Sequence, residues 1–183
     1  MRVISGTARG KKLNTLSGLN TRPTLDRVKE AVFSINQFDL EDKNVLDLFS
    51  GSGALAIEAL SRGAKNAVMC DNSYEAIKII KQNVKETRLI DKVEIINKDY
   101  AEALKKLNKE NKKFDIIFLD PPYKTDYIEK SLELISKYDL LNDNGLIICE
   151  SDNLDRIVYN DMYKAVKDKK YGDKYVVLLE KIC

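Results

Sequence analysis

The ten residues 45–54, VLDLFSGSGA, decide the fold of this chain. An apolar run passes directly into a glycine turn, Gly51-Ser52-Gly53, and the turn is followed by an apolar helical pattern. Glycines let a backbone turn sharply and approach a ligand closely at the point where a strand gives way to a helix. The stretch therefore predicts a strand, a ligand-binding turn and a helix in succession, which is the first unit of an open α/β fold.

Short apolar runs of the same kind recur along the chain, and each predicts a strand: residues 67–70, 93–96, 116–119 and 146–149. Helical patterns separate these runs. Residues 55–60 are apolar nearly all round, and stripes at helical spacing are formed by Ile77, Ile80 and Val84 and by Ile128, Leu132 and Ile135. Strands that alternate with helices predict a parallel sheet covered by helices on both faces.

The end of the chain breaks this alternation. Residues 163–171 and 175–179 are separated by little more than Gly172-Asp173, a combination that is typical of a tight hairpin. Two strands joined by a tight hairpin must be antiparallel. We therefore expect a mixed sheet of about seven strands, parallel through most of its width, with one reversed strand near an edge.

Length and composition are those of an ordinary globular chain. Its 183 residues suffice for one main domain with a small appendage, and 44% of them are hydrophobic. No segment has the pattern of a signal peptide or a membrane span, so we expect a cytoplasmic protein. Histidine is absent, and Cys70, Cys149 and Cys183 lie far apart. We therefore expect no disulfide framework, no metal site and no histidine base.

Basic residues are concentrated at the amino terminus. Residues 1–36 hold seven basic and two acidic side chains, whereas the whole chain has a net charge of only +2. This asymmetry predicts contacts to the phosphates of a nucleic acid, although a solvated charged surface would give the same pattern. We divide the chain into a basic arm, residues 1–23, and a main domain, residues 24–183.

Two elements are predicted in this basic region. Residues 2–5 and 11–14 flank a turn at Gly6–Gly10 and predict a short hairpin. Beyond Thr21-Arg22-Pro23-Thr24, one helical stripe is expected to pack on the main domain; it is formed by Leu25, Val28, Val32 and Ile35.

Acidic residues follow several predicted strands, at the edge where open α/β sheets bind ligands. Asp71 lies twenty residues after Gly51, at the spacing of a carboxylate that accepts both hydroxyls of a ribose. Asp99 could accept the amino hydrogens of an adenine, cap the following helix, or do both. Asp47 lies inside an apolar strand, where it could meet a ligand ammonium, order the glycine turn or form internal core hydrogen bonds.

These acids and the glycine turn predict a nucleoside site, but they leave the cofactor open. The spelling Gly51-x-Gly53-x-x-Ala56 satisfies the loose dinucleotide fingerprint, so a nicotinamide or flavin cofactor fits it as well as S-adenosylmethionine does.

The sequence Asp120-Pro121-Pro122-Tyr123 directly follows the apolar run 116–119. Two prolines end a strand, so a carboxylate, an unpaired carbonyl and a flat ring arrive together at the ligand-binding edge. This set matches a planar aromatic amine, with Asp120 and Pro121 accepting the amino hydrogens and Tyr123 stacking on the base. The alternative is a rigid turn whose tyrosine is merely exposed.

The order of the glycine turn, Asp71, Asp99 and Asp120-Pro121-Pro122-Tyr123 resembles the S-adenosylmethionine-dependent amino methyltransferases. More narrowly, the segments 2–6, 9–13 and 21–28 resemble the bacterial methyltransferases that modify guanine N2 in small-subunit (16S) ribosomal RNA, the RsmD family. This resemblance implies a Rossmann-like class I methyltransferase fold with a basic amino-terminal hairpin. It also implies ribosomal RNA as partner, with the assembled small subunit as substrate, and we expect a monomer.

The residues and the resemblance together give three predicted sets. The catalytic set is Asp120, Pro121, Pro122 and Tyr123. The cofactor set is Asp47, Phe49, Ser50, Gly51, Gly53, Asp71, Asn72, Asp99, Tyr100, Arg22 and Thr24. The RNA-binding set is Arg2, Arg9, Lys11, Lys12 and Arg27.

Other functions stay open at this point. Within the same chemistry, the acceptor could be adenine or cytosine of RNA or DNA, or a protein amide. A nicotinamide-dependent oxidoreductase is supported by the glycine fingerprint alone. A catalytically silent RNA-binding module is the third class, and it would not need Asp120-Pro121-Pro122-Tyr123.

Overall fold

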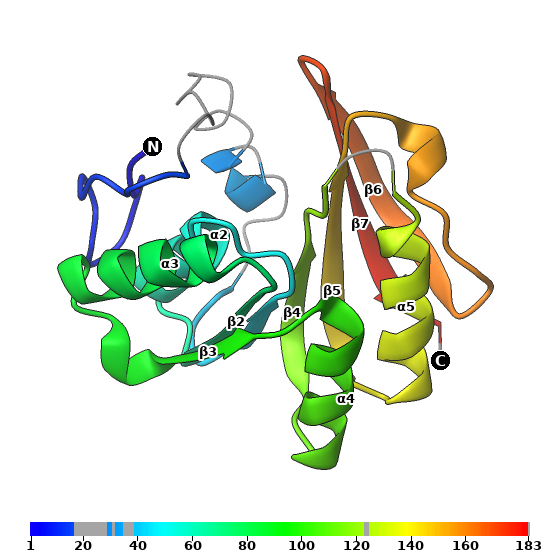
Figure 1. The fold of residues 1–183 in the computed structure, drawn as a ribbon. Coiled ribbons are helices and arrows are strands. Elements are labelled where there is room, and N and C mark those ends of the chain that lie inside the picture. The colour runs from blue at the N-terminus through cyan, green and yellow to red at the C-terminus, as the bar shows by residue number, and fades with distance from the viewer. Residues whose placement is uncertain (17–28, 31, 35–38, 123–124, 183) are drawn as a thin grey trace.

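The computed structural model describes residues 1–16, 29–30, 32–34, 39–122 and 125–182. These residues form one seven-stranded sheet with the strand order β3-β2-β1-β4-β5-β7-β6 (Figure 1). The strands are β1 (Asn44–Asp47), β2 (Asn66–Asp71), β3 (Val93–Asn97), β4 (Phe114–Leu119), β5 (Leu141–Ser151), β6 (Tyr163–Tyr171) and β7 (Lys174–Lys181). The α-helices are α2 (Ala54–Ser61), α3 (Tyr74–Glu86), α4 (Tyr100–Lys109) and α5 (Tyr127–Lys137), and short 3-10 helices are η1 (Ile90–Lys92) and η2 (Leu154–Arg156).

Helices cover both faces of the sheet, as predicted. α2 and α3 pack on one face, and α4 and α5 pack on the other (Figure 1). The predicted apolar stripes are buried in these two layers: Ile77, Ile80 and Val84 in the first, and Ile128, Leu132 and Ile135 in the second. The hydrophobic core is therefore divided by the sheet into two clusters, one under each pair of helices.

The topology creates a switch point between β1 and β4. β1 is parallel to both of its neighbours, β2 on one side and β4 on the other. The chain continues from β1 through β2 and β3, and then crosses back to place β4 and β5 on the other side. The carboxyl ends of β1 and β4 meet where open α/β sheets hold their ligands.

The carboxyl-terminal hairpin is confirmed. β6 and β7 pair in antiparallel register from Tyr163↔Lys181 to Tyr171↔Lys174, and β7 also pairs in antiparallel fashion with β5. β7 is thus the one reversed strand of the described sheet, next to its edge. Several strand boundaries differ from the prediction. β1 ends at Asp47 instead of Phe49, β4 begins at Phe114 instead of Ile116, and β5 begins at Leu141, earlier than the predicted run 146–149.

The predicted amino-terminal hairpin is present, with a single antiparallel bridge between its two segments. Arg2 and Lys12 form one antiparallel bridge, and Val3 N–H donates to the Lys11 carbonyl at 2.9 Å. Val3, Ala8 and Leu13 are buried in the core cluster beside α2 and α3. The predicted boundary between residues 23 and 24 lies outside the described residues.

The helix predicted after the arm is described only in part. Residues 29–30 and 32–34 are helical, and Val32 and Phe33 are buried in the same cluster as α2. The Phe33 ring lies 5.8 Å from the Phe118 ring, so this segment packs on the main domain as expected. Leu25, Val28 and Ile35 lie outside the described residues. Within the described chain, no helix is both long and apolar enough to cross a membrane.

Candidate active site at the carboxyl edge of the sheet

The turn after β1 requires its two glycines. Gly51 and Gly53 have φ values of 54° and 78°, in the left-handed region that side chains disfavour. A Cβ atom on Gly53 would lie 3.2 Å from the Met69 sulfur. The turn therefore brings its backbone close to the start of α2, where helical N–H groups point toward the ligand edge.

Asp71 orders this turn. Its two carboxylate oxygens accept hydrogen bonds from Gly51 N–H and Ser73 N–H, both at 2.9 Å. A carboxylate has about four acceptor positions, so these two bonds leave room for the ribose contact predicted from the sequence. Asp71 therefore orders the glycine turn, which was one of the roles considered for Asp47.

Asp47 is buried at the end of β1 without a partner. Its side chain is 1% exposed, and neither carboxylate oxygen has a hydrogen-bond partner among the residues that the structure describes. Burial raises the pKa of Asp47 to about 7, and the nearby charge of Asp120 adds to the rise. No hydrogen bond of good geometry from the described residues satisfies this carboxylate, although Ser50 and the Ala56 N–H lie near enough to oppose part of the rise in its pKa. An unpaired buried carboxylate is costly, and it is suited to a cationic ligand group.

Asp99 caps α4, as the sequence allowed. Its Oδ1 accepts hydrogen bonds from Ala101 N–H at 2.9 Å and Glu102 N–H at 3.0 Å. Both bonds use one oxygen, so the cap is compatible with a contact from the other oxygen to an adenine amino group. Asn72, predicted for the cofactor set, is exposed directly after β2.

Aromatic rings line the site between β1, α4 and α5. Phe49 lies 5.8 Å from Tyr100 and 5.9 Å from Tyr127, measured between ring centroids, and the Phe49 and Tyr127 rings are nearly parallel. Sequence analysis selected Phe49 and Tyr100 but missed Tyr127. The signal that could have identified Tyr127 is its position at the first turn of α5, four residues after Tyr123 in the sequence.

The catalytic motif leaves β4 as predicted, because the strand ends at Leu119 and the two prolines follow. Asp120 is partly buried, Pro121 is buried and Pro122 is exposed. Burial raises the pKa of Asp120 to about 6, while the charge of Lys174 opposes the rise. Asp120 therefore retains some exposure and lies at the end of β4, beside the switch point.

Four of the predicted site residues lie outside the described residues, and nothing is concluded about their placement. They are Tyr123 of the catalytic set, Arg22 and Thr24 of the cofactor set, and Arg27 of the RNA-binding set.

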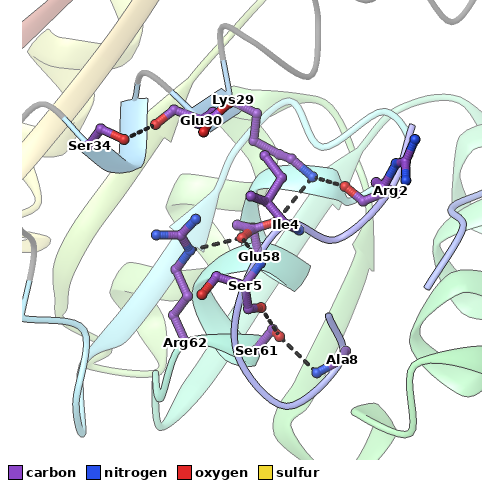
Figure 2. Close-up of polar contacts among 10 residues, drawn as sticks. All are labelled: Arg2, Ile4, Ser5, Ala8, Lys29, Glu30, Ser34, Glu58, Ser61 and Arg62. Atoms are coloured by element: carbon purple, nitrogen blue, oxygen red, sulfur yellow. Dashed lines mark hydrogen bonds and ion pairs between the residues drawn. The ribbon is translucent and has the colours of Figure 1, made fainter. Parts of the chain in front are cut away.

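The basic arm is attached to α2 through one buried acid. Glu58 is fully buried and accepts hydrogen bonds from the backbone N–H groups of Ile4 and Ser5, at 2.9 and 3.0 Å. Lys29 and Arg62 bind the same carboxylate at 3.1 and 2.8 Å (Figure 2). Burial acts to raise the pKa of Glu58, but the Ile4 hydrogen bond and the two cations outweigh it and lower the pKa.

Two further polar side chains hold the arm. Ser61 accepts from Ala8 N–H at 2.9 Å and donates to the Ser5 carbonyl at 2.6 Å (Figure 2). Asn83, on α3, donates to the carbonyls of Asn14 and Ser52 at 2.9 and 2.8 Å, which joins the end of the arm to the glycine turn. The predicted RNA-binding residues of the described arm remain exposed: Arg2, Arg9, Lys11 and Lys12.

A separate hollow of about 410 Å³ lies at the opposite edge of the sheet. It is lined by residues at the amino ends of β1 to β4, including Asn44, Asn66 and Phe114. Lys112 there is paired with Glu94. In an open α/β sheet the ligand edge is the carboxyl edge, so we assign the active site to the side that holds Asp47 and Asp120.

The combination of fold and site defines a class of protein. A glycine turn follows the first strand, acids end the adjacent parallel strands, and a reversed strand lies next to the edge of a seven-stranded sheet. Together with Asp120-Pro121-Pro122, these features are those of a Rossmann-like methyltransferase.

Comparisons with known proteins agree with this class and give the family. A family model described as "Conserved hypothetical protein 95" matches residues 1–180, and the chain belongs to this family. The chain is 41% identical to "Putative rRNA methyltransferase YlbH" of Bacillus subtilis, over 83% of each chain. It is 32% identical to "Ribosomal RNA small subunit methyltransferase D" of Haemophilus influenzae, over 94% of this chain and 89% of that one.

A solved structure supports the same assignment. "Putative methyltransferase yhhF" from Escherichia coli superposes with a TM-score of 0.84 and 29% identity, covering 99% of this chain and 97% of that chain. The likeness therefore extends over the arm as well as the sheet.

Proposed function

We propose that this protein transfers a methyl group from S-adenosylmethionine to the exocyclic N2 of a guanine in small-subunit ribosomal RNA, in the assembled subunit. The observation that carries the proposal is the placement of Asp120 and Pro121 at the β1/β4 switch point, next to the unpaired carboxylate of Asp47. One position there can bind an amino group to be methylated, and the other can bind a cationic cofactor.

The residues of this chain fit S-adenosylmethionine. When bound, it supplies a methyl group activated by a sulfonium. The unpaired oxygens of Asp47 are suited to its ammonium group, and the second acceptor positions of Asp71 are suited to its ribose hydroxyls. Tyr100 and Phe49 offer apolar surface for its adenine. Arg22 and Thr24 are proposed for its carboxylate on sequence grounds alone.

Asp120 and Pro121 would prepare the acceptor. The lone pair of a base amino nitrogen is delocalised into the ring, so the nitrogen is a poor nucleophile until its hydrogens are held. If the Asp120 carboxylate and the Pro121 carbonyl each accept one hydrogen, the lone pair is oriented for in-line attack at about 3 to 3.5 Å. Positive charge then develops on the nitrogen, and the anionic Asp120 stabilises it.

The later steps need no histidine. The alkylated nitrogen is strongly acidic, so its proton can leave after the transfer. Tyr123, by its position in the motif, would stack on the base, a contact worth on the order of 1 to 3 kcal/mol once the nucleotide is flipped out.

The RNA substrate is supported by two observations. The relatives above carry rRNA methyltransferase names, and the described arm exposes four basic side chains, those of Arg2, Arg9, Lys11 and Lys12. Basic side chains of this kind bind phosphates without reading sequence. A structured ribonucleoprotein is recognised largely by shape and phosphate placement, which suits a small basic arm beside the proposed active site.

Two alternatives remain distinguishable by experiment. An amino methyltransferase acting on adenine or cytosine of RNA or DNA would use the same carboxylate and carbonyl. A nicotinamide-dependent oxidoreductase is favoured by the glycine fingerprint only. Calorimetric titration with S-adenosylhomocysteine and with NAD separates the oxidoreductase from both methyltransferases.

The deciding experiment incubates the purified protein and radiolabelled S-adenosylmethionine with undermodified small subunits, naked ribosomal RNA and duplex DNA. Nucleoside analysis of label in N2-methylguanosine from the subunits would support both class and substrate. Label in N6-methyladenosine or N4-methylcytidine, or in DNA, would replace the guanine assignment. No label in any of the three substrates would contradict the proposal.

The role of Asp120 has its own test. Asp120→Ala should lower turnover by about a hundredfold or more, because one preorganised electrostatic contact is lost, while affinity for S-adenosylhomocysteine stays nearly unchanged. Asp143→Ala, at an exposed position near the other end of β5, is the matched control. Near-normal turnover of Asp120→Ala would remove this residue from the mechanism.

A further inference from the structure

Three neighbouring strands place ionisable side chains next to one another on one face of the sheet. Asp120 follows β4, Glu150 lies near the end of β5, and Lys174 begins β7. Leu119 pairs with Cys149 in the β4–β5 register. Asp120 and Glu150 are the next residues of these two segments, so they lie side by side across the sheet. Sequence analysis missed both Glu150 and Lys174.

The alternation of side chains along a strand fixes the face. Asp120, Glu150 and Lys174 are each two positions away from a residue of the core cluster under α2 and α3, and these residues are Phe118, Ile148 and Val176. Asp47 has the same relation to Val45, so it also faces this side.

Glu150 and Lys174 form a buried pair. Lys174 Nζ lies 3.3 Å from Glu150 Oε1, and the two side chains are only 10% and 9% exposed. Burial raises the pKa of Glu150 well above its usual range, and the charges of Asp120 and Asp173 add to the rise. Burial also lowers the pKa of Lys174, whereas Asp120 raises it. Lys174 is therefore within electrostatic reach of two carboxylates at once.

The charges around Asp120 are unbalanced in the described residues. The acids that interact with it are Asp47 and Glu150, Asp173 adds negative charge beside Glu150, and the cation that acts on Asp120 is Lys174. No three acidic or cysteine side chains in the described part of the chain converge as metal ligands would. Like charges at this spacing favour protonation, which would convert the amino-group acceptor into a hydroxyl donor.

We propose that Lys174 and Glu150 are positioning residues for methyl transfer: the ammonium keeps Asp120 anionic at neutral pH, and Glu150 holds that ammonium between the two carboxylates. The inference rests on the proposed function for its catalytic consequence only. The ammonium does not touch the acceptor. It acts through Asp120, which must accept a hydrogen bond in order to orient the amino nitrogen.

A purely structural salt bridge would behave differently when it is removed. Its loss would lower thermal stability and leave the ionisation of Asp120 unchanged. Loss of a cation that keeps Asp120 anionic would move the acid limb of the pH–rate profile, because activity requires the unprotonated carboxylate.

The first test is Lys174→Met, with the pH dependence of kcat as readout. We expect the acid midpoint to rise by roughly one pH unit, since an opposite charge at this range shifts a carboxyl by at least that much. Lys174→Arg should restore the wild-type midpoint. Lys181→Met, which removes a lysine from the far end of the same strand, should leave it unmoved.

Glu150→Gln gives a different expectation. Because its pKa is raised, Glu150 is largely protonated over the acid limb, so the neutral glutamine should keep the contact to the ammonium and leave the midpoint unchanged or slightly lower. The double variant Glu150→Gln/Lys174→Met should show a higher midpoint than Glu150→Gln. It is used if Lys174→Met alone fails to fold, because the double variant leaves no charged Glu150 without a partner. No difference between these last two variants, or a midpoint that rises in Glu150→Gln, overturns the inference.

A second readout does not depend on activity. The carboxyl 13C resonance of Asp120, assigned with Asp120→Asn, can be titrated by NMR without substrate in wild type, Glu150→Gln and Glu150→Gln/Lys174→Met. The same upward shift on loss of Lys174 is expected. If no RNA is methylated but this shift is found, the proposed function fails and the electrostatic inference stands; if the shift is absent, the inference fails alone.

Discussion

Two carboxylates in this protein are equally buried and have opposite surroundings. Glu58, on α2, is bound by two backbone N–H groups and by the cations Lys29 and Arg62. Asp47, at the end of β1, has no hydrogen-bond partner in the described residues. The pKa of Glu58 is lowered, whereas burial raises the pKa of Asp47 to about 7.

The difference separates a structural acid from a ligand-binding acid. A satisfied buried carboxylate stabilises the fold only in its charged form, and it ties together the segments that supply its partners. An unsatisfied one costs stability while the site is empty, and that cost is removed when a cation binds. Glu58 therefore attaches the arm, whereas Asp47 has the surroundings expected of the ligand-binding acid that we propose.

The largest expected effect comes from breaking the satisfied site. Glu58→Gln should lower the free energy of unfolding by about 4 kcal/mol, because Lys29 is left buried beside an uncharged group. Urea denaturation measures this change. The exposed pair Glu102 and Lys98 provides the control, and Glu102→Gln should change stability by less than about 1 kcal/mol. A Glu58→Gln variant as stable as the control would contradict the structural role.

Asp47→Asn should have the opposite sign. The folded-state pKa of Asp47 is raised above the unfolded value, so its contribution to stability is present at low pH and is lost as pH rises toward 7. The variant lacks this loss and should gain on wild type by about 3 kcal/mol between pH 5 and pH 8. Its affinity for S-adenosylhomocysteine should fall at least tenfold.

Comparison at each pH isolates Asp47, because Asp120 and Glu150 are present in both proteins. Unfolding curves of Asp47→Asn and wild type that stay parallel from pH 5 to pH 8 would show that Asp47 is not charged and unpaired in the folded protein. Unchanged cofactor affinity would remove it from the binding site.

The acids at the carboxyl edge of the sheet could be located from the sequence, whereas the role of Glu58 could not. Asp47, Asp71 and Asp120 follow apolar runs, and the carboxyl ends of parallel strands meet at one edge whatever the loops do. The backbone partners of Glu58 lie more than fifty positions away, at Ile4 and Ser5, and no local pattern predicts such a contact.

Fold predictions succeeded for a related reason. Strand and helix alternation depends on local periodicity, so the order of elements and the Gly172-Asp173 hairpin were predictable. The boundary errors arose where hydrogen bonding overrides composition. Ser50 Oγ donates to the Asp47 carbonyl and turns the chain at an apolar Leu48-Phe49, whereas residues 142–144 are polar and still join β5.

Glu150 could have been predicted as a residue at the carboxyl edge of the sheet, because its position in the sequence resembles that of Asp120. It directly follows the apolar run 146–149, as Asp120 follows 116–119, but lacks the prolines that drew attention to the latter. Lys174 had no such signal, because its place beside Glu150 depends on the register of β5 with β7.

Asn83 combines the two roles that are separate in Glu58 and Asp47, because its side chain binds both the arm and the glycine turn. Asn83→Ala should destabilise the protein by about 2 kcal/mol, because the partly buried carbonyls of Asn14 and Ser52 both lose their donor. Cofactor affinity should fall as well, since Ser52 belongs to the turn. Gln82→Ala, at the exposed neighbouring position, is the control; equal effects of the two variants would show that Asn83 has no special role.

The smallest effect is expected at an exposed acid whose pKa shift has the same sign as that of Glu58. Hydrogen bonds from Lys113 and Lys181 lower the pKa of Asp139 to about 2, yet the side chain is 54% exposed. Water screens such pairs, so Asp139→Asn should change the free energy of unfolding at pH 7 by less than about 1 kcal/mol. A loss as large as that of Glu58→Gln would mean that pairing alone, without burial, makes an acid structural. A small loss would show that burial is what separates Glu58 from other paired acids, and the same burial makes the unpaired Asp47 suited to a ligand.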